Sequence, residues 1–187
     1  MKKYKLTTQN LTTHNGFQWE VGEPRTTSGD GELCGPGWLH YYHHPLLAIL
    51  LNPMHADISD PILWEAEANG IHLDDHGLKG GCTQLTLTNR IELPTITLTN
   101  RVAFGILCAK TVCNDPAWNQ WADDWISGKD RSAEAAARSA ARSAAAAAWA
   151  AAWAAAAARS AARSAEAAAR SAAIDLIAIA ERAVTIT

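Results

Sequence analysis

Apolar and polar positions alternate over several short stretches of the first hundred residues, a spacing typical of β-strands. Residues 4–21 are rich in Thr, aromatic residues and Val around the turn pair Asn15-Gly16, which predicts strands joined by a turn. Residues 62–68 and 83–92 alternate more regularly, and each predicts a strand with one buried face. Loops are expected in the glycine-rich segments between them, 22–37 and 69–82.

Two further segments of this region have helical patterns. Pro45–Leu51 begins with proline and is apolar almost all round, which predicts a short buried helix that Asn52-Pro53 ends. The segment Thr97-Leu98-Thr99-Asn100-Arg101 repeats Thr86-Leu87-Thr88-Asn89-Arg90. We expect Thr99 or Asn100 of the second copy to cap a helix through Val112, although a second strand end is the alternative.

A tryptophan-rich helix is predicted next. Asp115 followed by Pro116 is a strong helix start, and Ser127-Gly128 ends the pattern. Trp118, Trp121 and Trp125 are spaced so that they share one face of this helix.

The tract 131–173 differs in composition from the rest of the chain, because 27 of its 43 residues are Ala. Ala has the highest helix propensity, and no Gly or Pro follows Lys129, so we expect one continuous helix about 65 Å long at about 1.5 Å per residue. Its other residues recur in steps of seven and four, an 11-residue repeat that favours a nearly straight helix. The tail 173–184 returns to an amphipathic pattern and is expected to dock on a core.

An Ala helix of this length buries little surface alone, so a partner helix is expected. The partner would be the globular part, another protein or the same tract in a second copy, which makes a homo-oligomer the expected state; a solvated spacer is the alternative. The residues that we expect to bind are the tryptophans and arginines of the two helices: Trp118, Trp121, Trp125, Arg138, Arg142, Trp149, Trp153, Arg159 and Arg163.

Composition and charge exclude several classes of function. A net charge of −3 gives no general affinity for nucleic acid. There is no apolar run long enough for a membrane span outside the Ala tract, which arginines interrupt, and the N-terminus lacks the apolar core of a signal peptide. The four cysteines form no CxxC pair, so free thiols in a reducing cytoplasm are expected.

The densest candidate for chemistry is a polar and aromatic cluster around residue 42. Histidine and aspartate side chains of this kind can act as acid, base or zinc ligand, but no metal-binding spacing is present, and packing or surface hydrogen bonding is the favoured interpretation. We therefore expect no metal and no cofactor. The cluster comprises His40, Tyr41, Tyr42, His43, His44, His55 and Asp57.

Weaker candidates lie elsewhere in the same region. The segment from His72 to His76 could bind a divalent ion, although a polar turn is the favoured interpretation. Cys34 would need His40 as a base to act as a nucleophile. Glu65 and Glu67 share one side of a predicted strand, where a solvated face is commoner than a pair of catalytic carboxylates.

Several motifs resemble a family of uncharacterised proteins from bacteriophage and prophage genomes. The resemblance covers about residues 16–187, includes the Ala-rich tract, and implies a phage origin and expression in the cytoplasm of a bacterial host. It implies no activity and no catalytic residues. The motifs are Gly16-Phe17-Gln18-Trp19, the run from Cys34 to Tyr41, the run from Pro45 to Pro53, His55-Ala56-Asp57, the run from Arg101 to Ala109, and Ser127-Gly128-Lys129-Asp130.

These observations together predict an α+β protein, a small head of strands and helices followed by a long Ala-rich helix. The expected divisions are a head at 1–114, a Trp-rich helix at 115–128 and the long helix with its docking tail at 130–184. The favoured function is non-enzymatic, an accessory phage protein that binds and inhibits a component of host defence. The alternatives are a protein that sequesters a nucleotide signal, a structural phage component assembled through the Ala-rich helix, and an enzyme with a His, Tyr or Cys site in the head.

Overall fold

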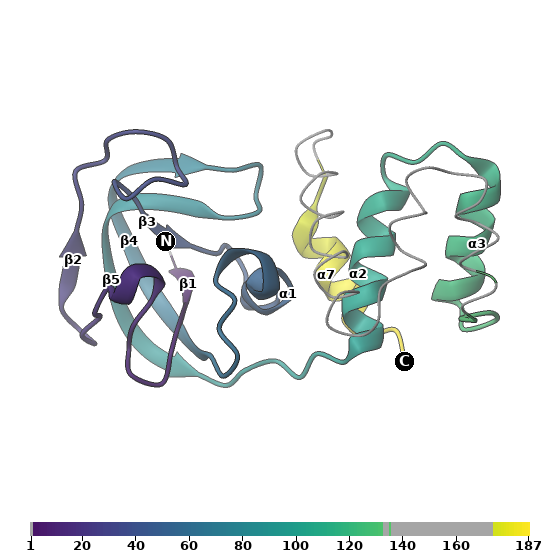
Figure 1. Ribbon diagram of the computed structural model, residues 1–187, viewed down its shortest axis with the longest axis horizontal. Coiled ribbons are helices and arrows are strands. Elements are labelled where there is room, and N and C mark those ends of the chain that lie inside the picture. Colours follow the sequence, from purple (N-terminus) through teal and green to yellow (C-terminus); the bar gives the residue numbers. More distant parts are fainter. Residues whose placement is uncertain (1, 133–134, 136–173) are drawn as a thin grey trace. The chain divides into compact units, whose positions relative to one another are not determined.

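The computed structural model describes residues 2–132, 135 and 174–187, which belong to two compact units, Met1–Thr95 and Ile96–Thr187 (Figure 1). The described residues form a five-stranded antiparallel sheet and four α-helices, so the mixed α+β class is confirmed. The predicted head, 1–114, spans the first unit and the first helix of the second. The predicted long helix lies almost entirely outside the described residues.

The first unit contains all the described strands and one α-helix. Its strands are β1 (Lys2–Thr7), β2 (Pro24–Thr26), β3 (Leu39–Tyr41), β4 (Ile62–Asp74) and β5 (Gly80–Ile91), and its helices are the 3₁₀ turn η1 (His14–Gly16) and α1 (Pro45–His55). β4 pairs with β1 and β5, and β5 pairs with β3 near its start and with β2 near its middle.

The sheet closes on itself into a small barrel. Directly after β3, Tyr42 exchanges two backbone hydrogen bonds with Tyr4 of β1, at 2.8 and 2.9 Å between nitrogen and oxygen. This contact completes the ring β1–β4–β5–β3, which we call the barrel. Because a full ring leaves few strand edges open, closure protects most of the strands from pairing with other chains.

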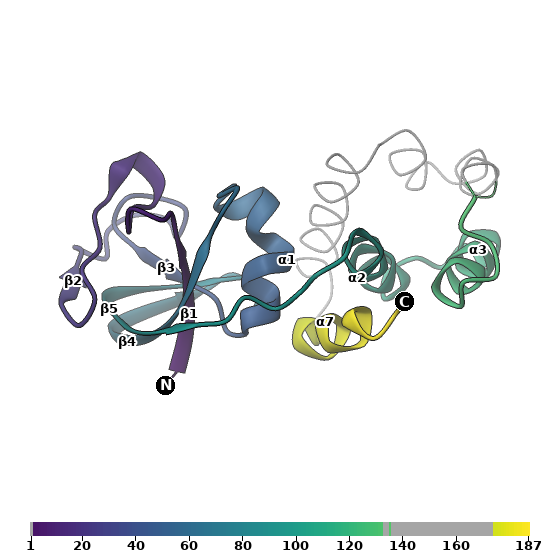
Figure 2. The ribbon, with the colours of Figure 1, turned by 90° about the horizontal axis from the view of Figure 1, so that it is seen from below.

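The two faces of β1 are different because its side chains alternate. Leu6 lies opposite Leu63, both are buried, and α1 contacts β1 (Figure 2). Lys3, Lys5 and Thr7 point the other way, toward the interior that Trp64 shares. The interior is packed mainly with apolar and aromatic side chains: Trp19, Leu39, Tyr41, Ile62, Trp64, Ala66, Ala68, Cys82, Leu85 and Leu87.

The expected loop at 69–82 is wrong, because β4 and β5 run through it and only 75–79 form the turn. Two of its glycines, Gly80 and Gly81, mark close packing along a strand rather than flexible backbone. A methyl group added to Gly80 would overlap the ring of Tyr41, and one added to Gly81 would overlap Leu33. Gly70 has a φ of +80° at a bulge between paired segments, a conformation that glycine adopts readily.

Other boundaries differ by a few residues. Asn52-Pro53 does not end α1, which continues to His55, while the Asn52 side chain exchanges hydrogen bonds with the backbone of Ile58. Of the segment 4–21, only β1 is a strand; the rest holds η1 and isolated bridges. The glycine-rich segment 22–37 contains the short strand β2.

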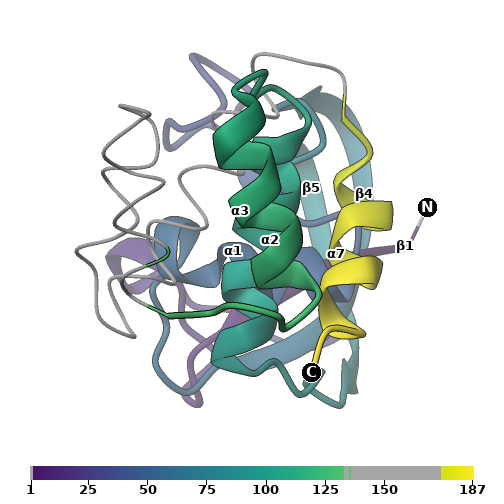
Figure 3. The same ribbon diagram turned by 90° about the vertical axis from the view of Figure 1, so that its right-hand side faces the viewer.

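The second unit is helical where it is described, with α2 (Leu98–Lys110), α3 (Pro116–Ile126) and α7 (Leu176–Val184). α2 contacts both of the others and α7 runs beside it (Figure 3). The Asp115 cap of α3 is confirmed, with its carboxylate accepting from the nitrogens of Ala117 and Trp118. The tail helix α7 contacts α2 and buries Leu176, Ala180 and Ala183.

Asn100 joins the two ends of this unit. Thr97, rather than Thr99 or Asn100, caps α2, and its hydroxyl and the Asn100 side chain form a reciprocal capping box. The Asn100 amide nitrogen also donates to the carbonyl oxygens of Ala183 and Ile186, at 3.1 and 2.8 Å. One buried side chain therefore satisfies backbone groups of two helices.

Candidate functional site

The two histidine-rich segments that the sequence singles out meet at one end of the barrel. Tyr41 and His43 come from the end of β3 and the turn before α1, while His72 and Asp74 come from the end of β4. Lys3, on β1, is the fifth member of the group. We call Lys3, Tyr41, His43, His72 and Asp74 the mouth cluster.

A chain of hydrogen bonds connects three of its members. The Lys3 ammonium lies 2.9 Å from Nδ1 of His43, and Nε2 of the same ring lies 2.6 Å from Oδ2 of Asp74. An ammonium group can only donate, so Nδ1 accepts and Nε2 carries the proton that is donated to Asp74. His43 is therefore the neutral Nε2–H tautomer, held between a cation and an anion.

Tyr41 forms the second part of the cluster. Its ring lies under the Lys3 ammonium, 4.9 Å from nitrogen to ring centre, and its hydroxyl lies 3.2 Å from Nδ1 of His72. The Tyr41 and His43 rings meet edge to face, at 5.4 Å between centres. Contacts from β1, β4 and the turn before α1 therefore converge on one aromatic ring.

Burial shifts the pKa values of three groups in this cluster. It lowers the pKa of Lys3, and burial with the nearby Lys3 charge lowers the pKa of His43 despite the opposing effect of Asp74. Burial raises the pKa of Tyr41 to about 12. At neutral pH the His43 imidazole and the Tyr41 phenol are therefore both uncharged.

The polar atoms of the cluster hold the hairpin in place. Oδ1 of Asp74 accepts a hydrogen bond from the backbone nitrogen of Gly77 at 2.8 Å, so both carboxylate oxygens are engaged. In the described part of the chain, no serine, threonine or cysteine nucleophile is hydrogen-bonded to His43. The cluster fixes the end of the β4–β5 hairpin to β1 and β3, and this is the role that its geometry supports directly.

Lys5 lies deeper in the barrel, two positions after Lys3 on the same face of β1. Its side chain is buried, its ammonium donates to the His40 carbonyl at 2.7 Å, and it lies 5.2 Å from the ring centre of Trp19. Burial lowers its pKa to about 8, since no carboxylate among the described residues pairs with it.

A family model for a domain of unknown function, DUF7666, matches residues 1–99. The chain belongs to this family. Comparison with curated proteins and with solved structures gave no match. The matched segment contains the whole barrel, so the mouth cluster and both buried lysines lie in the DUF7666 domain.

The side chains of the other histidines and tyrosines of the predicted cluster have partners outside the mouth cluster of the DUF7666 domain. The His40 ring contacts the Leu33 carbonyl, and burial lowers its pKa to about 4. Nδ1 of His44 accepts from the backbone of Leu46 as the cap of α1. The Tyr42 ring stacks on His55 at 5.9 Å, and Asp57 is exposed just beyond α1.

The weaker candidates do not form a catalytic arrangement. The Lys79 ammonium lies 3.4 Å from the Cys34 sulfur, and His40 is not its partner. Glu65 binds Lys2 at 2.6 Å, which lowers its pKa, while Glu67 is exposed. Within the described ranges, no three His, Cys, Asp or Glu side chains come together as metal ligands would.

Of the residues expected to bind through the helices, three are described. Trp118, Trp121 and Trp125 share the buried face of α3, and the Arg131 guanidinium lies 4.8 Å from the Trp125 ring centre. The remaining ones lie outside the described residues: Arg138, Arg142, Trp149, Trp153, Arg159 and Arg163. No helix in the described part of the chain has the length and hydropathy of a membrane span.

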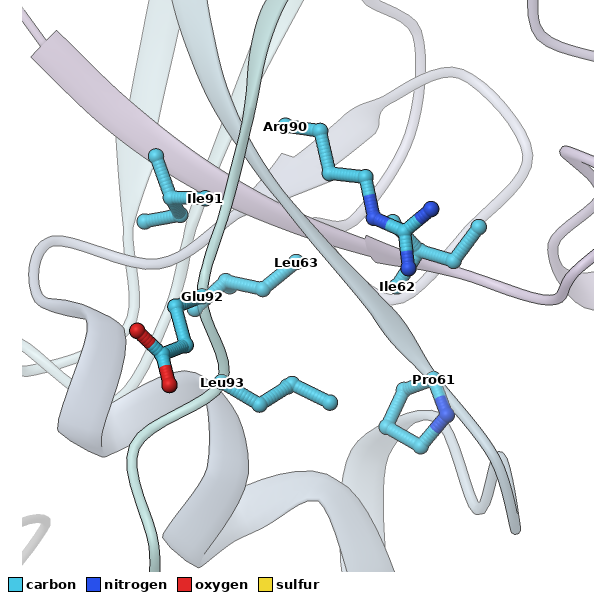
Figure 4. A pocket seen from close by; sticks show the side chains of 7 residues that line it. All are labelled: Pro61, Ile62, Leu63, Arg90, Ile91, Glu92 and Leu93. Carbon is cyan, nitrogen blue, oxygen red and sulfur yellow. The ribbon is translucent and has the colours of Figure 1, made fainter.

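An open cleft of about 390 Å³ lies at the other end of β4. In Figure 4 the Arg90 side chain extends toward Ile62, while the Glu92 carboxylate points away from it. Pro61 and Leu93 supply apolar walls. The cleft and the mouth cluster occupy opposite ends of one strand, so they share no residue.

Lys3 and Lys5 were missed by the sequence reasoning. The signal for them is present, since Lys3, Lys5 and Thr7 alternate with Tyr4 and Leu6 as the two faces of a strand would. Lysine is almost never fully buried, so the pattern favours solvent for the polar face. The structure reverses this expectation because Leu6 faces the side that α1 covers, which leaves the lysines inside the barrel.

Proposed function

We propose that this protein is a non-enzymatic bacteriophage protein that acts in the host cytoplasm by binding and blocking a component of bacterial defence. The observation that carries the proposal is the hydrogen-bonded mouth cluster, which fixes the end of the β4–β5 hairpin. A rigid projecting hairpin suits recognition of another macromolecule, because little conformational freedom is lost when it binds. We call residues 68–80 of this hairpin the arm.

The protonation states of His40, Tyr41 and Cys82 support binding over catalysis, and Lys5, with a pKa of about 8, is buried and bonded to a backbone carbonyl. A general acid or base works best with a pKa near the operating pH. Here burial lowers the pKa of His40 to about 4 and raises those of Tyr41 and Cys82 to about 12 and 11. These three groups therefore keep one protonation state near neutral pH, as structural groups do.

The arm also presents apolar side chains to solvent. Ile71 is 63% exposed and Leu73 is 38% exposed, and they share one face because they are two positions apart on β4. Polar residues flank them, among them Asn69 and Asp75. An apolar patch with a polar rim is typical of a protein–protein contact.

A plating assay in defended bacteria tests the proposal. The wild-type protein is expressed in host strains that each carry one defence system, and plaque formation by a phage that this system blocks is counted. We expect plating to be restored in at least one strain. The double variant Ile71→Asp, Leu73→Asp should lose this effect at equal expression, because it places two charges in the contact.

Val112→Asp is the matched control, since Val112 is similarly exposed at 41% but lies in the second unit. It should restore plating as well as the wild type. If the arm variant is as effective as the wild type, the arm is not the contact. If no strain is rescued and a turnover of substrate is found that His43→Gln abolishes, the protein is an enzyme and the proposal is wrong.

A further inference from the structure

The arm has an open backbone edge. β1 covers β4 only as far as Glu67, which pairs with Lys2, so among the described residues the segment 68–74 has β5 as its single strand neighbour. Residues 69–74 are all exposed. The segment Ala-Asn-Gly-Ile-His-Leu-Asp contains none of the lysines or prolines that often protect a strand edge from pairing.

Alternation decides which backbone groups face outward. The nitrogen of Asp75 donates to the Lys79 carbonyl across the turn, and the nitrogen of Ile71 donates to the Thr83 hydroxyl. Odd-numbered residues of this segment therefore direct their backbone groups toward β5. In an antiparallel ladder the residues between them face the other way, so His72 and Asp74, which follow the bulge at Gly70, present their N–H and C=O groups to the open edge.

This edge is complementary to itself. When two copies are placed antiparallel with His72 opposite His72, Gly70 of each copy lies opposite Asp74 of the other. The outward N–H and C=O groups of the two His72 residues then pair with each other, giving about two hydrogen bonds at a two-fold axis. Asp74 faces a glycine rather than another acid, so no two carboxylates are directly opposed.

The side chains agree with the same register. Ile71 of each copy lies opposite Leu73 of the other, on the face away from His72. Four apolar side chains then form one patch, and paired branched side chains stabilise neighbouring strands. The bulge lies before His72, so the central pair and the residues after it are on regular strand.

We propose that the occupant of this edge is a second copy of the same chain, paired through the arm about a two-fold axis at His72. The pairing does not depend on the proposed function. It would support that function, because it doubles the apolar patch that would contact a target. The contact is shorter than a standard interface, so the dimer should form in a concentration-dependent manner.

Sedimentation of the full chain over a wide concentration range tests the pairing. The wild type should shift from the 20.0 kDa monomer toward twice that mass. His72→Lys places two ammonium groups opposite each other and should remain monomeric, whereas the uncharged His72→Gln should still dimerise. Both variants lose the Tyr41 contact, so their comparison isolates the effect of charge.

Cross-linking tests the register. In a Cys34→Ser, Cys82→Ala, Cys113→Ser background, which also removes the thiol opposite residue 72 on β5, His72→Cys should give a disulfide-linked dimer on mild oxidation, because paired Cα atoms in such a ladder are about 5.5 Å apart. Asn69→Cys is the control on the same exposed strand. Asn69 of one copy lies opposite Asp75 of the other, so the two thiols that this control introduces are roughly 20 Å apart and should not cross-link.

The outcomes separate clearly. A wild type that is monomeric at every concentration overturns the inference, as does a dimer that His72→Lys leaves intact or equal cross-linking through positions 69 and 72. Failure of the plating assay with specific cross-linking at 72 would remove the proposed function and leave the self-pairing in place.

Discussion

Replacing Lys5 by methionine should stabilise the barrel at neutral pH. Burial lowers the pKa of this lysine from 10.5 to about 8, and each pKa unit corresponds to about 1.4 kcal/mol, so burial of the charged form costs about 3 kcal/mol. Methionine removes this cost but also loses the bond to the His40 carbonyl and the contact with Trp19, together about 2 kcal/mol. The expected net gain is about 1 kcal/mol at pH 7.

The pH dependence is a sharper test than the net gain. The folded protein releases the Lys5 proton near pH 8, whereas the unfolded chain holds it until about pH 10.5, so the unfolded state binds more protons in that interval. The free energy of unfolding of the wild type should therefore rise between pH 8 and 10.5, by about 3 kcal/mol from this group. Lys5→Met lacks this contribution, so its advantage at pH 7 should become a disadvantage near pH 10.5.

The assay is urea unfolding of the full chain at pH 7, 8, 9 and 10, with hydrogen exchange of peptides from the first unit to assign the change to the barrel. Lys2→Met is the control, because Lys2 lies on the same strand with a side chain 58% exposed and should change the stability and its pH dependence little. A Lys5→Met protein that is less stable than the wild type at pH 7, with the same slope above pH 8, would refute the reasoning.

Three further changes probe the packing and the hydrogen bonds. Gly80→Ala should destabilise the barrel by about 1–3 kcal/mol in urea, because the added methyl group overlaps Tyr41; no loss of stability would show that the strand can shift. Because the pKa of His43 is lowered on folding, the unfolded state binds more protons as pH falls below 6.5, so barrel stability should fall there; His43→Gln should flatten this dependence in thermal melts between pH 7 and 4.5. Asn100→Ala should cost about 2–4 kcal/mol and speed hydrogen exchange in 183–187, whereas unchanged exchange there would mean that Asn100 does not hold the tail.

Local signals in the sequence predicted most of the helices and the main strands. Asp115-Pro116 specifies the start of α3 because a carboxylate that accepts from the first amides and a proline act within one turn. The second TLTNR copy begins α2 and the first lies in β5, as expected. Local signals gave the wrong result at Gly80 and Gly81, where the glycines predicted a loop. Glycine is needed there because Tyr41 and Leu33, about forty or more positions away in the sequence, pack against the strand.

The candidate site was predicted in pieces. Both histidine segments stood out by composition, but their meeting depends on the β4–β5 register and on the closing contact between Tyr4 and Tyr42. Lys3 carried no chemical signal of its own. Its place between Tyr41 and His43 follows from which face of β1 is covered by α1, and a single sequence does not specify that choice.

Closure of the barrel also has a consequence for the order in which it folds. The β4–β5 hairpin joins neighbouring segments, whereas Thr7 of β1 meets Trp64 across 57 positions of sequence. Contacts between distant segments form slowly, since a long loop must close before they stabilise anything. The arm should therefore exist before the ring is complete, and Lys3 and Lys5 should lose their water only in the last step, which makes the dehydration of two ammonium groups part of the folding barrier.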